Sequence, residues 1–385
     1  MALTLCIMAA LVASPAGQTR WKHGPKFGPG YFPIAVWLQN PANAERFQRA
    51  GINLYIGLWQ GPTEEQLAAL TRARMPVICE QNAVGLAHRD DPIIVGWMHQ
   101  DEPDNAQPVT DASGQQSWGP CVPPEKIVAE YGRLRANDPT RPILLNLGQG
   151  VINDTWVGRG SGAKLSDYET YVKGGDIVSF DVYPIAGLDK PKPIDYMWYV
   201  GAGVERLRGW AGDSRTVWNC LECTRISNGV RKATPEQVRS QAWMGIIHGS
   251  RGLIYFVHEF KPAFNESALL DDPPMLRAVT ELNAEITRLA PVINSPDLNV
   301  NIRVPGAQPS ERPAVAAVGK QVGDATYLFA VGMRNADTRA VLTLPQLANR
   351  AVVEVIGENR TLPIRNGSIE DTFAPYAVHL YRVQR

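Results

Sequence analysis

The sequence predicts an α/β fold: a (β/α)8 TIM barrel followed by a small C-terminal all-β sandwich domain. Over residues 26–294, short apolar strand-like runs alternate with amphipathic helix-like runs. The length of this region is close to the ~250 residues that eight strand–helix units occupy. After residue 294 the helical periodicity stops, and short strand-like runs separated by turn residues continue to residue 385. Such spacing is typical of an antiparallel sandwich.

Eight strand-like runs define the barrel. They lie at residues 33–38, 52–58, 76–79, 93–99, 143–147, 177–182, 216–221 and 252–257. In IVSFDVYP, Val178 and Phe180 alternate with Ser179 and Asp181. A doubly wound open sheet, the competing fold, needs strands that are apolar on both faces. The alternation therefore favours a barrel whose polar and aromatic face, which includes Trp59 after the second strand, points inward.

Helix-like runs separate most of these strands. They lie at residues 41–50, 62–74, 124–137, 195–211, 235–248 and 274–289. Three segments, residues 63–66, 166–169 and 234–237, have the capping-box form in which Ser or Thr is followed three residues later by Glu or Gln. Residues 295–385 predict six or seven strands and contain no cluster of catalytic residue types.

The charge balance and the N-terminus limit the possible partners. The 38 basic residues equal the 38 acidic residues, so no electrostatic attraction to nucleic acid or to an anionic membrane is expected. Residues 1–18 resemble a signal peptide because residues 1–16 are apolar and uncharged, with Ala13, Ser14 and Ala16 as a cleavage site. This run is too short to span a bilayer. A secreted or periplasmic protein without a membrane span is expected.

The cysteines do not predict a metal site. Cys220 and Cys223 form a CxxC pair, which elsewhere indicates zinc or redox chemistry. Here the pair lies on a predicted strand, where residues three apart point to opposite faces. Buried free thiols are the preferred interpretation, and no cofactor is expected.

Two acidic segments end predicted barrel strands. The fourth strand runs into QDEPDN, with Asp101 and Glu102, and the seventh runs into CLEC, with Glu222. By strand parity Glu222 shares a face with Cys220 and is expected to point into the barrel mouth. A lone carboxylate among apolar neighbours is costly to bury without a partner or a function. The structural alternatives are an ion pair with Arg225 or another base for Glu222 and an exposed loop acid for Glu102.

Strands four and seven of an eight-stranded barrel lie across the mouth from each other, so their terminal acids can flank one bound group. A two-carboxylate glycosidase needs this arrangement: one acid donates a proton to the leaving oxygen, and the other, ionised, attacks or supports the sugar carbon.

The strand-four DEP with Glu102, the strand-seven CLE with Glu222 and the following β-sandwich resemble the clan A glycoside hydrolases, which are retaining (β/α)8 enzymes. The resemblance implies that Glu102 is the acid/base and Glu222 the nucleophile. It also implies that Tyr183, on strand six, supports the nucleophile. Two features depart from the clan. Asp101 stands where the clan has Asn, and the Trp that usually ends strand eight is absent, with Tyr255 and His258 in that segment instead.

Sugar sites combine flat aromatic surfaces with amides and acids, and the strand ends supply such residues. The candidate substrate-binding residues are Trp37, Gln39, Trp59, Gln81, Asp101, Asn146, Asp181, Tyr183, Tyr255 and His258. For Asp181 we expect a binding or orienting function rather than a third catalytic acid. The long loop over residues 103–123 is expected to shape the site, with Trp118 either stacking on substrate or fixing the loop.

These residues together predict a secreted glycoside hydrolase that cleaves β-linked glycosides by double displacement, with a carbohydrate as its partner. A catalytically inactive carbohydrate-binding barrel is the alternative, because Asp101 and the missing Trp depart from the clan. A metal-dependent hydrolase using His99 and His258 is a third hypothesis, although no HxH or HExxH spacing supports it.

Overall fold

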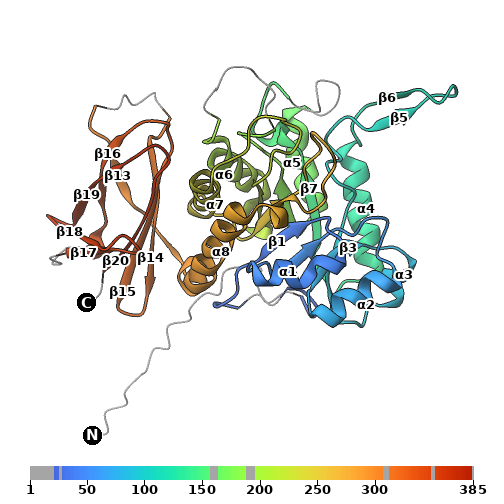
Figure 1. Cartoon of the computed structure of the whole chain (residues 1–385), viewed down its shortest axis with the longest axis horizontal. Helices are drawn as coiled ribbons and strands as arrows, with labels where there is room; N and C mark the ends of the chain where they lie inside the picture. The colour runs from blue at the N-terminus through green and yellow to red at the C-terminus, as the bar shows by residue number, and fades with distance from the viewer. Residues whose placement is uncertain are drawn as a thin grey trace, which may run out of the picture.

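The structure is a computed structural model that describes residues 21–25, 28–156, 164–187, 196–306, 312–347 and 352–383. It consists of an α/β barrel with an antiparallel β-sandwich beside it (Figure 1). Both parts of the predicted fold are confirmed. The predicted signal peptide, residues 1–18, lies outside the described residues. Among the helices that the structure describes, none combines the length and the apolar character needed to cross a membrane.

The barrel strands are parallel and follow each other in chain order around the ring. They are β1 (Ile34–Trp37), β2 (Leu54–Ile56), β3 (Val77–Glu80), β4 (Ile94–Met98), β7 (Ile143–Leu147), β8 (Ile177–Phe180), β9 (Thr216–Val217), β10 (Asn219–Glu222) and β11 (Leu253–Phe256). β9 and β10 are two parts of the predicted seventh strand: β9 pairs with β8, and β10 pairs with β11. Because β11 also pairs with β1, the ring closes.

The barrel centre is filled by small and branched apolar side chains, which include Ala35, Leu54, Ile56 and Ile254. In β2, Leu54 and Ile56 therefore point inward, and the prediction that the polar and aromatic face of this strand lines the interior is wrong. Tyr55 packs outside against Phe47, with 6.1 Å between the ring centroids, and its hydroxyl reaches the Asn40 carbonyl oxygen at 3.3 Å. On this outer side the ring packs against another aromatic ring and its hydroxyl has a hydrogen-bond partner.

Helices cover the outside of the ring. They are α1 (Ala44–Arg49), α2 (Glu64–Ala73), α3 (Ala83–Ala87), α4 (Pro124–Asn137), α5 (Tyr168–Tyr171), α6 (Tyr199–Ala211), α7 (Pro235–Ile247) and α8 (Pro273–Ile293). The predicted capping boxes at Thr63 and Thr234 are both present. The box predicted at Ser166 is not, because a 3-10 turn precedes α5 and Asp167 accepts instead from the Lys164 backbone N–H at 2.8 Å.

The sandwich contains a six-stranded sheet in the order β12-β14-β15-β20-β17-β18 and a three-stranded sheet in the order β13-β16-β19. Its strands are β12 (Asp297–Leu298), β13 (Asn301–Arg303), β14 (Val315–Val322), β15 (Ala325–Gly332), β16 (Thr338–Thr343), β17 (Val352–Val355), β18 (Arg360–Pro363), β19 (Ser368–Phe373) and β20 (Val378–Val383). The described part of this region thus has more, and shorter, strands than predicted, and all its ladders are antiparallel.

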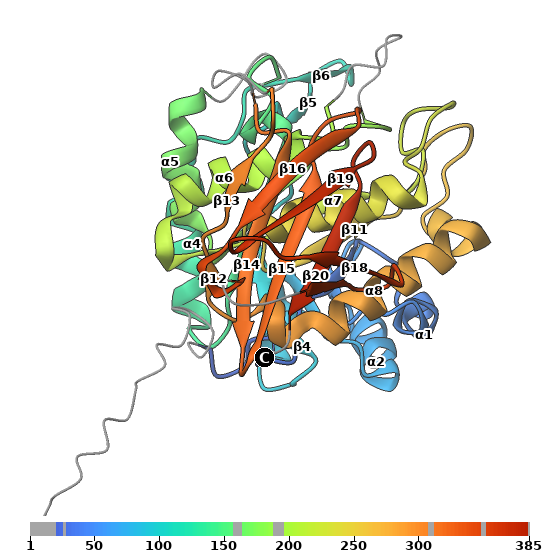
Figure 2. The same ribbon diagram turned by 90° about the vertical axis from the view of Figure 1, so that its left-hand side faces the viewer.

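β15, a central strand of the six-stranded sheet, is largely buried on both faces. Along β15, Leu328 and Ala330 enter the core of the sandwich, whereas Phe329 and Val331 join the core of the barrel. Phe329 packs edge-on against Trp243 of α7, with 4.9 Å between the ring centroids. Figure 2 shows this sheet lying over α7 and α8. Burial of both faces explains why β15 is apolar throughout its second half instead of alternating.

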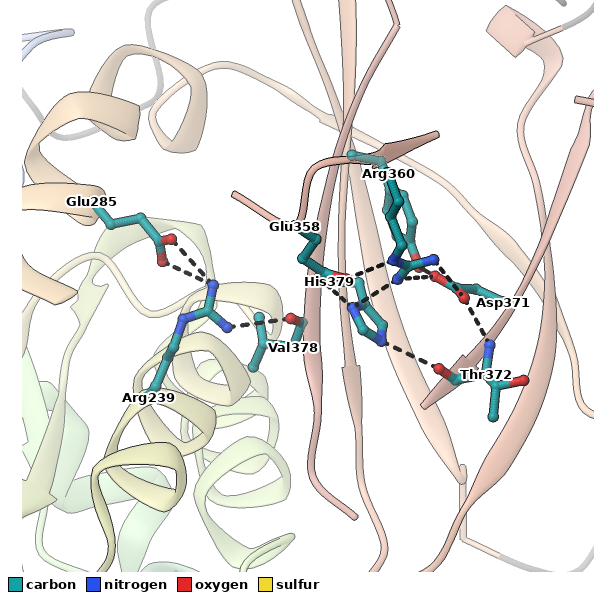
Figure 3. A network of polar contacts seen from close by, with 9 residues as sticks. Arg239, Glu285, Glu358, Arg360, Asp371, Thr372, Val378 and His379 are labelled. Carbon is teal, nitrogen blue, oxygen red and sulfur yellow. Dashed lines mark hydrogen bonds and ion pairs between the residues drawn. The ribbon is translucent and has the colours of Figure 1, made fainter. Parts of the chain in front are cut away.

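Polar contacts connect the elements of the sandwich (Figure 3). Arg360 of β18 donates two hydrogen bonds to Asp371 of β19, at 3.0 and 2.8 Å. His379 of β20 bonds Glu358 at 2.6 Å. Burial opposes ionisation of Asp371, but hydrogen bonds from Arg360 and Tyr381 outweigh it and lower the pKa of this carboxyl. The network therefore joins three strands from the two sheets.

Two further contacts attach the sandwich to the barrel. Arg239 of α7 donates to the Val378 carbonyl oxygen at 3.2 Å and to the Glu285 carboxylate of α8 at 3.1 Å (Figure 3). Lys320 of β14 donates to the carbonyl oxygen of Ile293, the last residue of α8, at 2.7 Å. A cation at a helix C-terminus satisfies free carbonyl groups and interacts favourably with the helix dipole.

The described cysteines are unpaired, and Cys79, Cys220 and Cys223 are buried. The interpretation of the CxxC pair as buried thiols is confirmed. Burial raises the pKa of all three thiols, which disfavours the reactive thiolate.

Candidate functional site

A cavity of about 910 Å³ opens at the C-terminal ends of the barrel strands. The side chains that line it come from the ends of β1 and β11 and from the segments that follow β1, β2, β4, β7, β8, β10 and β11. Of the predicted site residues, the cavity brings together Trp37, Gln39, Trp59, Asp101, Glu102, Asp181, Tyr183 and His258. This is the end of the barrel at which the catalytic groups of barrel enzymes lie.

Two carboxylates in the cavity share one amide. Asn146, a buried residue of β7, donates from Nδ2 to Asp101 Oδ1 at 2.9 Å and to Asp181 Oδ1 at 2.8 Å. Its own Oδ1 accepts from the Ser179 hydroxyl at 2.6 Å, which fixes the orientation of the amide. Because both carboxylate oxygens bond one nitrogen atom, they are separated by less than about 6 Å, within the scale of a catalytic carboxyl pair.

The two carboxyl groups differ in their surroundings. Asp101 opens to the cavity but is enclosed by protein on its other sides, and this desolvation, together with the charge of Asp181, raises the pKa of Asp101 to about 7. Asp181 accepts a second hydrogen bond from the Tyr183 hydroxyl at 2.7 Å. Burial and the neighbouring charge of Asp181 raise the pKa of Tyr183 well above its usual value, so the phenol keeps its proton and remains a donor. Donors of this kind stabilise an ionised carboxylate.

Glu102 also faces the cavity, from the residue after Asp101. Its Oε2 accepts a hydrogen bond from Asn105 Nδ2 at 2.6 Å, and its backbone N–H donates to the Asn146 carbonyl oxygen at 3.2 Å. The backbone of Glu102 is left-handed, with φ of +43°. A side chain in this region costs roughly 1–3 kcal/mol and persists where the surrounding structure holds it, often at functional sites.

Glu222 lies elsewhere, fully buried and outside the set of cavity-lining residues. Its Oε1 accepts from the Ile185 backbone N–H at 2.8 Å and from Gln241 Nε2 at 2.9 Å, and its Oε2 accepts from the Ala186 backbone N–H at 2.6 Å. The predicted orientation into the barrel mouth is therefore wrong. The carboxylate lies towards α7 and the loop after β8, where three donors bind it.

Glu222 does not form the ion pair with Arg225 that the structural alternative names, because Arg225 pairs with Glu259 at 2.7 Å instead. Burial raises the pKa of Glu222 to about 7 even though its three hydrogen bonds act in the opposite direction. The assignment of Glu222 as nucleophile stays a prediction from the sequence.

Two other predicted site residues bond helices rather than the cavity. Gln81 donates to the Leu134 carbonyl oxygen at 3.0 Å and accepts from Asn137 at 2.8 Å, both on α4. The Tyr255 hydroxyl donates to Asn283 of α8 at 2.9 Å. Neither side chain lines the cavity, so the structure does not bring these two candidate substrate-binding residues to the site.

The long loop forms a projecting hairpin of β5 (Pro108–Thr110) and β6 (Gln116–Trp118) (Figure 1). Trp118 is 63% exposed on it and does not line the cavity. Stacking on a substrate in the cavity, one of the two predicted functions of this side chain, does not follow from its position.

An aromatic wall was not predicted from the sequence. Phe256, Phe260 and Phe264 line the cavity beside His258. The rings of His258 and Phe264 are stacked, with centroids 6.0 Å apart and an interplanar angle of 15°. Phe264 is 64% exposed and Phe260 47%. The signal that could have indicated this wall is the run of aromatic residues at the end of the eighth strand and after it, FVHEFKPAF.

Gln39 and His258 complete this wall. Gln39 Nε2 lies 3.2 Å from His258 Nε2 and 2.6 Å from the Glu266 carbonyl oxygen. Burial lowers the pKa of His258, which favours the neutral imidazole. Within the described parts of the chain, no group of three or more His, Cys, Asp or Glu side chains is arranged to hold a metal ion.

The fold is similar to those of solved glycosidases. A catalytic mutant of Gan42B, a GH42 β-galactosidase from G. stearothermophilus, matches 92% of this chain and 98% of its own, with 10% identity and a TM-score of 0.59. For AmyP in complex with maltotriose, the match covers 92% of this chain and 97% of AmyP, with 9% identity and a TM-score of 0.51. For AmyB, a noncanonic maltogenic α-amylase from Thermotoga neapolitana, the match covers 92% of this chain and 99% of AmyB, with 10% identity and a TM-score of 0.50.

This likeness confirms the barrel fold expected from the clan A resemblance. No protein-family model and no curated protein sequence matches the chain.

Proposed function

We propose that this protein is a glycoside hydrolase that cleaves β-linked glycosides with retention of configuration. The observation that carries the proposal is the cavity itself, which is lined both by carboxyl groups that follow β4 and β8 and by an aromatic wall at and after the end of β11. A sugar presents hydroxyl edges and flat C–H faces, and this cavity offers acceptors for the first and aromatic surface for the second.

The chemistry needs two carboxyl groups with different protonation. One must hold a proton for the leaving oxygen, and the other must be ionised beside the anomeric carbon. The cavity supplies both states within a short distance, because Asp101 has a raised pKa while Asp181 is stabilised by two donors. The solved neighbours with TM-scores of 0.50 or more support the proposal, since they include a β-galactosidase and an amylase.

The sequence assigned the acid/base to Glu102 and the nucleophile to Glu222. Glu102 lies in the cavity, as an acid/base requires. Glu222 would have to leave three hydrogen bonds and cross to the inner side of β10 before it could meet a sugar. A retaining mechanism therefore needs a different carboxylate of the cavity as its nucleophile.

The position of Glu222 also favours a second candidate, a carbohydrate-binding barrel without catalysis. In that case the cavity binds sugar but does not cleave it. Calorimetry with oligosaccharides, followed by long incubation and chromatography of the mixture, separates the two functions: binding without any product supports the second candidate.

A panel of nitrophenyl α- and β-glycosides tests the proposal. We expect the wild-type protein to release nitrophenol from at least one β-glycoside. The double variant Glu102→Gln/Asp181→Asn removes one cavity carboxylate that follows β4 and one that follows β8. Purified identically, it should release no nitrophenol. Equal rates for the two preparations would reveal a contaminating hydrolase and contradict the proposal.

We also propose that the protein is exported, which rests on the signal-like residues 1–18. Expression of the full chain in a bacterial host, cell fractionation and N-terminal sequencing of the product test this. A mature protein that begins near residue 17 outside the cytoplasm supports it, and an intact N-terminus in the cytosol contradicts it.

A further inference from the structure

We propose that Asp181 is the nucleophile of this reaction and that Asp101 is its acid/base. The inference rests on the proposed glycosidase function and replaces both carboxylates that the sequence assigned. It is carried by the positions of the two carboxyl groups in the cavity and by the amide that bridges them.

A catalytic carboxyl group must be accessible to a substrate in the cavity. Asp101 is exposed to the cavity and Asp181 is partly exposed, whereas Glu222 has no exposed surface. A nucleophile must come within about 3–3.5 Å of the carbon that it attacks. Asp181 enters the cavity from the end of β8, so it can face the acids at the end of β4 across a bound sugar.

The distance between the Asp101 and Asp181 carboxylate oxygens is limited by Asn146. Asn146 holds one oxygen of Asp101 at 2.9 Å and one oxygen of Asp181 at 2.8 Å from a single nitrogen atom. This bridge limits the distance between those oxygens to less than about 6 Å, which agrees with the 5–5.5 Å of retaining enzymes and is shorter than the 6.5–9.5 Å of inverting ones.

The surroundings of Asp101 and Asp181 decide which of the two carboxyl groups holds the proton. Asp181 accepts from Asn146 and from Tyr183, two donors that favour its ionised form. Asp101 accepts from Asn146 alone among these side chains and faces the charge of Asp181, so the proton of the pair resides on Asp101. The hydrogen bonds to Asp181 and the raised pKa of Asp101 thus assign the negative charge of the pair to the nucleophile and the proton to the acid.

The reaction follows from these states. An Asp181 carboxylate oxygen attacks the anomeric carbon and forms a glycosyl ester, while the bond from that carbon to the leaving oxygen breaks and the leaving oxygen takes the proton of Asp101. Asp101, now ionised, removes a proton from water as the water oxygen attacks the anomeric carbon. The ester bond breaks, the free sugar leaves, and both carboxyl groups return to their initial states.

Glu102 then has a different task. Its Oε2 accepts a hydrogen bond of 2.6 Å from Asn105. The carboxylate also faces the cavity, where it can accept a hydrogen bond from a substrate hydroxyl. Replacement of Glu102 should therefore raise KM more than it lowers kcat, while replacement of Asp181 should mainly lower kcat.

Trapping identifies the nucleophile directly. The probe is the dinitrophenyl deoxyfluoro β-glycoside of the sugar that the wild-type protein hydrolyses, which accumulates the glycosyl ester, and peptide mass spectrometry then locates the label. We expect the label on Asp181. A label on Glu222, Glu102 or Asp101 overturns the assignment while leaving the proposed glycosidase function intact.

The acid/base is tested with the same leaving group. Dinitrophenolate departs without a proton, so Asp101→Asn should keep formation of the ester but hydrolyse it at least about a hundredfold more slowly, with azide restoring turnover as a glycosyl azide of retained configuration. The Asp181→Gly variant with azide should instead give the azide of inverted configuration. An Asp101→Asn enzyme with unchanged turnover of both activated and unactivated glycosides overturns the assignment of Asp101.

An NMR titration tests the Asp101–Asp181 pair without any substrate, including the case in which no glycoside of the panel is hydrolysed. Carbon NMR of labelled aspartate carboxyl groups follows the titration of Asp101 in the wild type and in Asp181→Asn, whose amide preserves the size of the side chain. We expect the pKa of Asp101 to fall when the charge of Asp181 is removed. An unchanged titration of Asp101 would show that the two groups do not form a pair.

Discussion

Gln241 of α7 donates a hydrogen bond of 2.9 Å to the carboxylate of Glu222, on the helix side of β10 and away from the cavity. The same carboxylate holds the backbone N–H groups of Ile185 and Ala186 in the loop that follows Asp181 and Tyr183. Glu222 therefore fixes the course of the chain directly after the cavity-facing end of β8. In this position it acts on the site through the loop and not through contact with a sugar.

The first prediction concerns Glu222→Gln. The amide nitrogen that replaces one carboxylate oxygen faces a donor, so one buried N–H loses its acceptor. We expect the free energy of unfolding at pH 7 to fall by roughly 2 kcal/mol, and kcat/KM to stay within about tenfold of the wild-type value. Denaturant titration and kinetics on an activated glycoside check both. Glu205→Gln, at an exposed position on α6, is the control and should change neither. Complete loss of turnover in a folded Glu222→Gln protein would restore the sequence-based assignment.

The second prediction is the pH dependence of stability at Glu222. Burial raises the folded-state pKa of this carboxyl from 4.5 to about 7, so the folded state binds the proton more tightly than the unfolded state. The resulting stabilisation is fully present below pH 4.5 and is lost as the pH rises through 7. Between these limits, the stability of the wild type relative to Glu222→Gln should fall by on the order of 3 kcal/mol. Parallel denaturation of the two proteins across this range measures the difference, and a constant offset would contradict it.

The third prediction concerns the junction of barrel and sandwich. Lys320 Nζ is buried and donates to the carbonyl oxygens of Ile293 and Ser295, at 2.7 and 2.8 Å, and to Asp297 at 2.5 Å. Lys320→Met leaves these acceptors without their donor, and we expect a loss of about 3 kcal/mol in the free energy of unfolding. Thermal denaturation checks it. The exposed Lys126→Met is the matched control, and an equally small effect of both variants would show that these hydrogen bonds contribute nothing.

The fourth prediction concerns the aromatic wall. Phe264 lines the cavity with most of its ring exposed, so Phe264→Ala removes stacking surface for a sugar beyond the reacting one. Such stacking contributes about 1 kcal/mol, and KM for an oligosaccharide should rise roughly fivefold, with little change for a nitrophenyl monosaccharide. Trp118→Ala, equally exposed but on the β5–β6 hairpin outside the cavity, is the control. Equal effects of the two variants would contradict a binding function for this wall.

Much of the fold could be predicted because it depends on local patterns. All eight predicted barrel strands are present, since each is a short apolar run bounded by turn residues, and the capping boxes at Thr63 and Thr234 formed because their side chains satisfy backbone groups within one turn. The direction of individual side chains was harder to predict. Tyr55 and Tyr255 have hydroxyl partners on segments distant in sequence, which decided their faces.

The candidate site was predicted in part for the same reason. Asp101, Glu102, Asp181 and Tyr183 reached the cavity because strand alternation holds to the end of β8 and the acids of β4 follow directly at the strand end. Glu222 did not, because three donors from the loop after β8 and from α7 determine where its carboxylate lies. Strand parity contains no information about such donors.

The configuration of the first product tests the central claim most directly, namely that this cavity cleaves glycosides between two carboxyl groups that lie close together. Proton NMR can follow the anomeric signal while the wild-type protein hydrolyses an aryl β-glycoside, before mutarotation mixes the anomers. The account predicts that the β-anomer appears first. Initial formation of the α-anomer would contradict the short separation of the pair, and an absence of hydrolysis across the whole panel would contradict the proposed function.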